Sequence, residues 1–98
     1  MIYVWLADMQ PGLTREQRDE ALIRRAAWKW PDNVKVLGEY WPLGEAPAVI
    51  SIFEADDFSG IMELSLTWAD KFKITCVPAC TPEQGLQWGP TIIASRSA

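Results

Sequence analysis

The chain has 98 residues, no histidine, and a formal net charge of −4 from 13 acidic and 9 basic residues. This length fits one domain with a single core, and an acidic chain without a basic run is a poor partner for nucleic acid. The absence of histidine excludes imidazole metal ligands, His-ligated haem and the most common general base, so we expect no cofactor. No apolar run is long enough to span a bilayer and no basic region precedes the apolar N-terminal residues, which predicts a soluble, cytoplasmic protein.

Six tryptophans are many for a chain of this length. Each aromatic side chain has about 150–250 Å² of surface to bury, and a small core can take only part of that load. We therefore expect some of the aromatic surface to lie in a subunit interface or a ligand pocket.

The chain has two cysteines, Cys76 and Cys80. Without further cysteine or histidine they cannot complete a tetrahedral zinc site. Free thiols are the expectation for a reducing compartment, and a disulfide across Pro78 is the alternative.

The first part of the chain predicts a strand followed by a helix. Bulky side chains alternate on both faces over Ile2–Asp8, which is typical of a central strand covered on both sides. Thr14 and Gln17 form a capping-box signature that starts a helix over residues 15–29. The apolar arc of this helix contains Leu22, Ile23, Ala26, Ala27 and Trp30. Trp28 projects away from this arc and is a poor fit to the same core.

The middle of the chain predicts a β-hairpin. Two runs rich in β-branched and aromatic residues, Val34–Trp41 and Ala48–Glu54, flank a loop over Pro42–Pro47. The prolines at both loop ends cannot continue a ladder of backbone hydrogen bonds, and Gly44 permits a positive φ. The chain therefore reverses direction here.

A second helix and a last strand follow the hairpin. Asp56 or Asp57 caps a helix over Phe58–Trp68. The apolar face of this helix carries Phe58, Ile61, Met62, Ser65, Trp68 and Ala69. The last strand runs over Phe72–Pro78.

A C-terminal tail, residues 81–98, follows the domain of residues 1–80. It contains a short turn of helix over Thr81–Leu86 and an apolar run over Thr91–Ala94. The apolar run predicts an added edge strand or an arm exchanged with a second subunit.

The element order is β-α-β-β-α-β, the ferredoxin-like pattern of the α+β class. Right-handed crossovers place two helices on one face of a four-stranded antiparallel sheet. The third strand is apolar on both parities, with Ile50 and Ile52 on one and Val49 and Phe53 on the other. The helix-free face therefore needs a cover, and we predict a homodimer with two sheets packed face to face, a dimeric α/β barrel.

Several segments of residues 1–86 are distinctive in order and spacing. They are Val34–Gly38 followed by Tyr40 and Trp41, Phe53–Asp57, and Trp68–Asp70 leading into Phe72–Pro78. Through them the chain resembles the dimeric α/β-barrel superfamily, and within it a small bacterial and archaeal family catalogued as a domain of unknown function. The resemblance implies the fold and a homodimer and no settled activity. Relatives in the superfamily include cofactor-independent monooxygenases, muconolactone-type isomerases, ligand-sensing modules and haem enzymes, and the lack of histidine departs from the haem enzymes.

The aromatic side chains that we expect to converge are Tyr3, Trp5, Tyr40, Trp41 and Trp68. In a cleft between sheet and helices they could hold a flat aromatic or quinone-like ligand, and packing in the core or interface is the alternative. Tyr40 and Trp41 are adjacent, so at most one of them can line such a cleft. The predicted ligand site comprises Tyr3, Trp5, Trp41 and Trp68, with Asp70 as the polar anchor.

Three carboxylates, Glu39, Glu54 and Asp70, are weak candidates for catalysis. A carboxyl group in a dry cleft has a raised pKa and could move a proton, whereas pairing with a cation such as Lys35 is the structural alternative. Asp70 opposes the dipole of the preceding helix, so it either bonds to the backbone of the turn or anchors a ligand. The sequence has no nucleophile–base pair, phosphate loop or carboxylate cluster with metal-ligand spacing.

Three functions are compatible with these features. The first is a homodimeric module that binds a small aromatic or apolar molecule with little or no catalysis. The second is a cofactor-independent monooxygenase or isomerase that acts on a phenolic, quinol or lactone substrate. The third is a structural partner protein that uses Trp28 and Trp88 as a contact surface.

Overall fold

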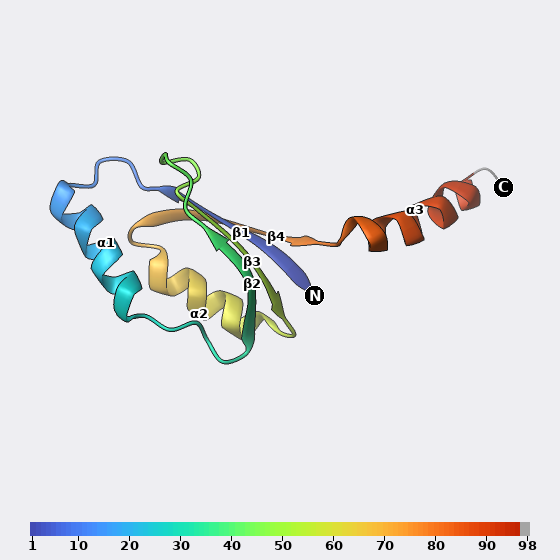
Figure 1. Ribbon diagram of the computed structural model, residues 1–98, viewed down its shortest axis with the longest axis horizontal. Helices are drawn as coiled ribbons and strands as arrows, with labels where there is room; N and C mark the ends of the chain where they lie inside the picture. The colour runs from blue at the N-terminus through green and yellow to red at the C-terminus, as the bar shows by residue number, and fades with distance from the viewer. Residues whose placement is uncertain (97–98) are drawn as a thin grey trace.

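A computed structural model describes residues 1–96 of the chain (Figure 1). The elements, in order, are β1 (Ile2–Met9), α1 (Arg15–Ala27), β2 (Val34–Tyr40), β3 (Val49–Ala55), α2 (Phe58–Trp68), β4 (Phe72–Ala79) and α3 (Pro82–Arg96). The first six follow the predicted β-α-β-β-α-β order, so the ferredoxin-like α+β fold is confirmed. Positions 97–98, the end of the predicted tail, lie outside the described residues.

The four strands form one antiparallel sheet in the order β2-β3-β1-β4. In the central strand β1, Trp5 opposes Ser51 of β3 on one side and Cys76 of β4 on the other. Trp5 and Ala7 of β1 are buried against the helices, while Val4 and Leu6 alternate onto the helix-free side and are half-buried.

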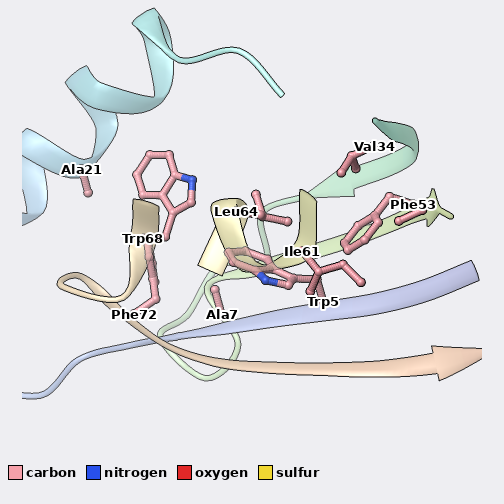
Figure 2. Close-up of a cluster of buried hydrophobic side chains, with 10 residues drawn as sticks. Trp5, Ala7, Ala21, Val34, Phe53, Ile61, Leu64, Trp68 and Phe72 are labelled. Atoms are coloured by element: carbon pink, nitrogen blue, oxygen red, sulfur yellow. The ribbon is translucent and has the colours of Figure 1, made fainter. Parts of the chain in front are cut away.

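The core lies between α2 and the sheet. Figure 2 shows its side chains, with Ala21 of α1 at one end; the buried apolar residues are Trp5, Ala7, Ala21, Val34, Phe53, Ala55, Ile61, Leu64, Trp68 and Phe72. The helix α2 has the predicted bounds and is capped by Asp57, which accepts a hydrogen bond from the Ser59 amide at 2.9 Å. A Cβ at Gly60 would lie 2.7 Å from Cγ2 of Val34, so glycine is what lets α2 approach β2 this closely.

The helix α1 has the predicted start and a different buried face. The Gln17 amide donates to Oγ1 of Thr14 at 3.2 Å and the Thr14 amide donates to Oε1 of Gln17 at 2.8 Å, which confirms the capping box. The predicted apolar arc is wrong as a core face for Leu22 and Ile23, which are 59% and 71% exposed while Ala21 is the buried residue. Its last member, Trp30, does pack against the core. The helix also ends at Ala27, two residues before the predicted end.

The prediction for Trp28 is also wrong. Its ring packs against Trp30 at 5.0 Å between centroids and against Trp68 at 5.6 Å in an edge-on arrangement. The backbone at Trp28 is already extended, and this turns the side chain inward instead of along the helical arc. Contact between α1 and the aromatic core is thus made largely by residues that follow the helix.

The predicted edge strand over Thr91–Ala94 is wrong, because the tail folds as the single helix α3. A second capping box starts it: the Gln84 amide donates to Oγ1 of Thr81 at 3.1 Å, and the Thr81 amide donates to Oε1 of Gln84 at 3.0 Å. The helix that starts at these local bonds continues through the β-branched residues near its end, despite their preference for strands. The helix projects from the end of β4, on the opposite side of the molecule from α1, and none of its described residues is buried (Figure 1).

None of the helices in residues 1–96 combines the length and apolar character that crossing a membrane requires.

Candidate functional site

A cavity of about 260 Å³ lies between α1 and the sheet, next to the loop that joins β2 and β3. Five of the six tryptophans line it: Trp5, Trp28, Trp30, Trp41 and Trp68. Their edges and faces meet at several angles, so the cavity is bounded by rigid aromatic surfaces. A pocket with this lining suits a flat apolar molecule.

Two residues of the cavity lining, Trp5 and Ser51, carry buried polar groups without a partner among the described residues. Trp5 and Ser51 are 3% and 1% exposed and oppose each other in the ladder between β1 and β3. Within the described residues, Nε1 of Trp5 and Oγ of Ser51 have no hydrogen-bond partner. Buried polar atoms are nearly always bonded in native proteins, so this pair calls for an explanation.

One wall of the cavity holds an ion pair. Arg25 of α1 donates two hydrogen bonds to Glu39 of β2, from Nε to Oε2 at 3.0 Å and from Nη2 to Oε1 at 2.5 Å. The indole of Trp41 donates to Oε2 of Glu39 at 3.0 Å. Burial alone would raise the pKa of Glu39, but the bonds from Arg25 and Trp41 outweigh it and hold this pKa below its ordinary value.

Glu39 reaches the cavity because β2 contains an irregularity. Val36 opposes Phe53 on the helix-facing side of the sheet. The register then shifts before Gly38, so that Glu39 opposes Ser51 on that same side. In an uninterrupted strand, Val36 and Glu39 would point to opposite faces. The bulge is therefore what turns this carboxylate toward the cavity.

The structure brings together three of the aromatic residues predicted for the ligand site. Trp5, Trp41 and Trp68 all line the cavity. Tyr3 lies outside the lining and stacks on Phe53 with 5.9 Å between ring centroids. Of the adjacent pair, Trp41 lines the cavity while Tyr40 pairs with Ile50 on the helix-free side of the sheet, so that only one of the two reaches it.

The polar anchor predicted at Asp70 lies outside the cavity. Nη1 and Nη2 of Arg24 each donate to one carboxylate oxygen of Asp70 at 2.8 Å. Nη1 of Arg24 also donates to the backbone carbonyl of Thr67 at 2.8 Å, in the last turn of α2. These bonds compensate for the unfavourable position of Asp70 at a helix C-terminus, and the bond from Arg24 holds the pKa of this carboxyl below its ordinary value. Through Arg24, Asp70 thus connects α1 to the C-terminal end of α2.

The remaining candidate, Glu54, is separate from the cavity. It opposes Ile2 on one side and Lys35 on the other, on the helix-free side of the sheet. Of the three predicted carboxylates, Glu39 alone lines the cavity.

Sequence reasoning missed Trp28, Trp30, Arg25 and Ser51. Ser51 carried a usable signal, because it is a polar residue at the same parity as Val49 and Phe53 in an otherwise apolar strand. Trp28 and Trp30 lie beyond the end of α1, where helical periodicity no longer predicts the direction of a side chain.

Metal-ligating clusters and the two cysteines are the other places where chemistry could reside. Residues 1–96 contain no group of three or more Cys, Asp or Glu side chains placed to hold a metal ion. Cys76 and Cys80 are free, and burial raises the pKa of the Cys76 thiol, which keeps it protonated and unreactive at neutral pH.

Comparisons with known proteins identify the family. Searches among curated proteins and among solved structures found no match to this chain. The family model of DUF3303, a domain of unknown function, matches residues 1–91. This match supports the predicted resemblance to an uncharacterised family, while the wider superfamily stays a prediction. The chain belongs to the DUF3303 family.

Proposed function

We propose that this protein is a binding module for a small, flat, largely apolar molecule that enters the cavity between α1 and the sheet. The observation that carries the proposal is the convergence of five tryptophans around about 260 Å³ of space. A pocket of this size, lined mainly by aromatic side chains with a few polar groups, is the default candidate for a ligand site.

The attachment of α1 supports a preformed cavity. Ala21 is the buried residue of this helix, and four ion pairs connect it to the rest of the described chain. The pairs are Arg18 with Glu45, Arg24 with Asp70, Arg25 with Glu39, and Glu20 with Lys71. These contacts join α1 to the β2–β3 loop, to β2 and to the turn after α2. They hold the helix in place without filling the space beneath it.

A catalytic role has less support than binding. A cofactor-independent monooxygenase or isomerase acting on a phenolic, quinol or lactone substrate would need a base, and Glu39 is the carboxylate in the lining. Arg25 and Trp41 occupy both oxygens of Glu39 and lower its pKa. A carboxylate held in this way is a weak base that must first lose its partners.

Titration with 9-fluorenone, a flat neutral tricyclic ketone, tests the proposal. We expect quenching of tryptophan fluorescence that saturates with one ligand per chain. The variant Ala21→Phe fills the cavity from α1 and should abolish binding, whereas Ala26→Phe on the exposed side of the same helix should leave it intact. Equal binding to both variants, with both folded by circular dichroism, would contradict the location of the site.

The catalytic alternative has a separate readout. Incubation with a quinol such as 1,4-dihydroxynaphthalene should give oxygen consumption no faster than the buffer alone. Consumption that depends on the protein and is lost in Glu39→Gln would instead favour the monooxygenase.

The helix-free face of the sheet supports a homodimer as the functional unit. Apolar side chains form two rows across it, one through Val77, Val4 and Ile52, and one through Leu6, Ile50 and Tyr40. A second copy presents the same surface, so a two-fold association covers both faces at once.

The exposed helix α3 points to the same partner. Leu86, Trp88 and Ile92 are exposed on a helix of which no described residue is buried. At 100° per residue their positions share one half of the helix with Gly85 and Gly89, which permit close approach. The helix continues β4 away from its own sheet, so we propose that it packs as an arm on the second copy.

Sedimentation at micromolar concentration tests the dimer. We expect twice the chain mass of 11.1 kDa. Thr75 is exposed on the helix-free face, so Thr75→Arg should be tolerated by a single chain and should dissociate the dimer. Met62→Arg, on the exposed side of α2, should leave it intact. A wild-type protein that sediments at one chain mass would contradict both the dimer and the arm.

A further inference from the structure

We infer that the ligand of the cavity is a neutral molecule with a carbonyl-type oxygen, and that the indole N–H of Trp5 and the hydroxyl of Ser51 bind this oxygen. The inference rests on the proposed binding function and narrows the class of ligand. Trp5 and Ser51 oppose each other across β1 and β3, and both line the cavity.

The geometry of the sheet brings the two groups together. Side chains that oppose each other in an antiparallel pair have Cβ atoms about 4.5–5.5 Å apart, so Trp5 and Ser51 start side by side on the sheet face that lines the cavity. Trp5 lies between α2 and the sheet, beside Leu64 and Ile61 (Figure 2). Both residues come from regular strands, which gives the pair a fixed position in the cavity lining.

The pair is also dry. Each of the two polar atoms exposes less than 1 Å² to solvent, and within residues 1–96 neither has a hydrogen-bond partner. The ligand oxygen therefore reaches them only when the side chains that cover them shift on binding. Leaving a buried donor unpaired destabilises the folded protein, and phenylalanine and alanine would fill the same positions without that cost. An indole N–H can only donate and a hydroxyl can donate to the same atom, so together they match an oxygen acceptor.

The charges around the cavity favour a neutral ligand. Two cationic side chains, Arg18 and Arg25, contribute to the lining. Arg18 is paired with Glu45 at 2.7 Å, and Arg25 is paired with Glu39. A charged ligand would lose its hydration here and find each of these charges already neutralised. Ketones, lactones, amides and quinones carry the required oxygen without a net charge.

A matched pair of probes tests this inference. Fluorene and 9-fluorenone share the same flat ring system and differ by a methylene group in place of the carbonyl, and neither reacts with free thiols. For the wild-type protein we expect fluorenone to bind about tenfold more tightly than fluorene, as for one or two net hydrogen bonds. Equilibrium dialysis measures both affinities without reference to tryptophan emission.

Two variants test whether Trp5 and Ser51 cause the tighter binding of fluorenone. Trp5→Phe keeps an aromatic ring and removes the N–H, and Ser51→Ala removes only the hydroxyl. Each should weaken fluorenone binding several-fold while the affinity for fluorene stays within about twofold. Leu66→Ala, on the exposed side of α2 and outside the cavity lining, is the control and should change neither affinity.

The indole proton of Trp5 provides a direct readout. In a ¹⁵N-correlated spectrum, its resonance is assigned by its loss in Trp5→Phe, or by selective labelling should that variant fail to fold. We expect a downfield shift of this proton with fluorenone and no comparable shift with fluorene.

The possible failures are distinguishable. Equal affinity for the two probes, or a fluorenone affinity that is unchanged in Ser51→Ala with no shift of the Trp5 proton, would overturn the acceptor site and leave the binding module standing. Failure of both probes to bind at their solubility limit would overturn the proposed function as well.

Discussion

The two helices of the β-α-β-β-α-β unit, α1 and α2, lie on one face of the sheet and are attached to it in different ways. The helix α2 buries Ile61, Leu64 and Trp68 and approaches β2 through Gly60. The helix α1 buries Ala21 and is connected by ion pairs to three other parts of the chain. One helix is packed into the core, whereas the other stands over a cavity.

The difference divides the fold into two parts. We call α2 and the core beneath it the structural half, and α1 with the cavity beneath it the binding half. Burying a large apolar side chain contributes about 1.5–3 kcal/mol, whereas an exposed ion pair contributes about 0–1 kcal/mol. The pairs of α1 with Glu45 and Asp70 are of the exposed kind, whereas the pair between Arg25 and Glu39 is more buried. The helix α2 is thus held by apolar burial, and α1 by polar contacts around the cavity.

The largest expected effect is on the free energy of unfolding. The same substitution, isoleucine to alanine, is made once on each helix. Ile61→Ala on α2 removes a side chain that is 4% exposed and should lower the free energy of unfolding by about 2–5 kcal/mol. Ile23→Ala on α1 removes one that is 71% exposed and should change it by less than about 0.5 kcal/mol. Urea denaturation followed by far-UV circular dichroism measures both.

Similar losses in the two isoleucine variants would contradict the comparison. In that case the apolar arc of α1 would be covered in solution, and the cavity would be smaller than described.

Local sequence signals were sufficient for α2 and for most of the sheet. The Asp57 cap and apolar spacing determine the bounds of α2, and the proline-flanked loop determines the hairpin, because all of these act within a few residues. The capping box at Thr14 belongs to the same class. A second box, at Thr81, was not used in the prediction, which has a short turn over Thr81–Leu86 where the long helix α3 forms.

The binding half depended on contacts that no local pattern contains. Apolar spacing predicted Leu22 and Ile23 as the core face of α1, but its position is determined by partners far along the chain, such as Asp70, 46 residues from Arg24. The strand parity of Glu39 changes at a bulge beside Gly38, and an isolated glycine in a strand indicates a bulge without determining how the register shifts. The cavity could therefore be anticipated through Trp5, Trp41 and Trp68 and not through Arg25 or Ser51.

An intermediate effect is expected for the ion pair in the cavity wall. Glu39→Gln removes the charge that Arg25 faces and should lower the free energy of unfolding at pH 7 by about 1.5–3 kcal/mol, the range for hydrogen bonds to charged groups. Because the pKa of Glu39 is lowered in the folded protein, its contribution is fully present above the ordinary value of 4.5. It is lost as the pH falls through the lower value of the folded state.

The measurement is the difference in free energy of unfolding between wild type and Glu39→Gln from pH 7 to pH 3. This difference should be constant above about pH 5 and shrink below it. A difference that grows with acidity would mean that burial dominates over Arg25 and that the pKa of Glu39 is raised.

The smallest effect on the free energy of unfolding is expected for the ion pair between Arg24 and Asp70, which connects α1 to the end of α2. The side chains of Asp70 and Arg24 are 55% and 28% exposed, so solvent screens the pair. Asp70→Ala should lower the free energy of unfolding by at most about 1 kcal/mol, and less in 1 M NaCl, where the screening length is about 3 Å. Since Asp70 lies outside the cavity lining, the affinity for fluorenone should not change. A reduced affinity at unchanged stability would instead restore Asp70 as a ligand anchor, and the cavity would then extend past Trp68 to the turn between α2 and β4.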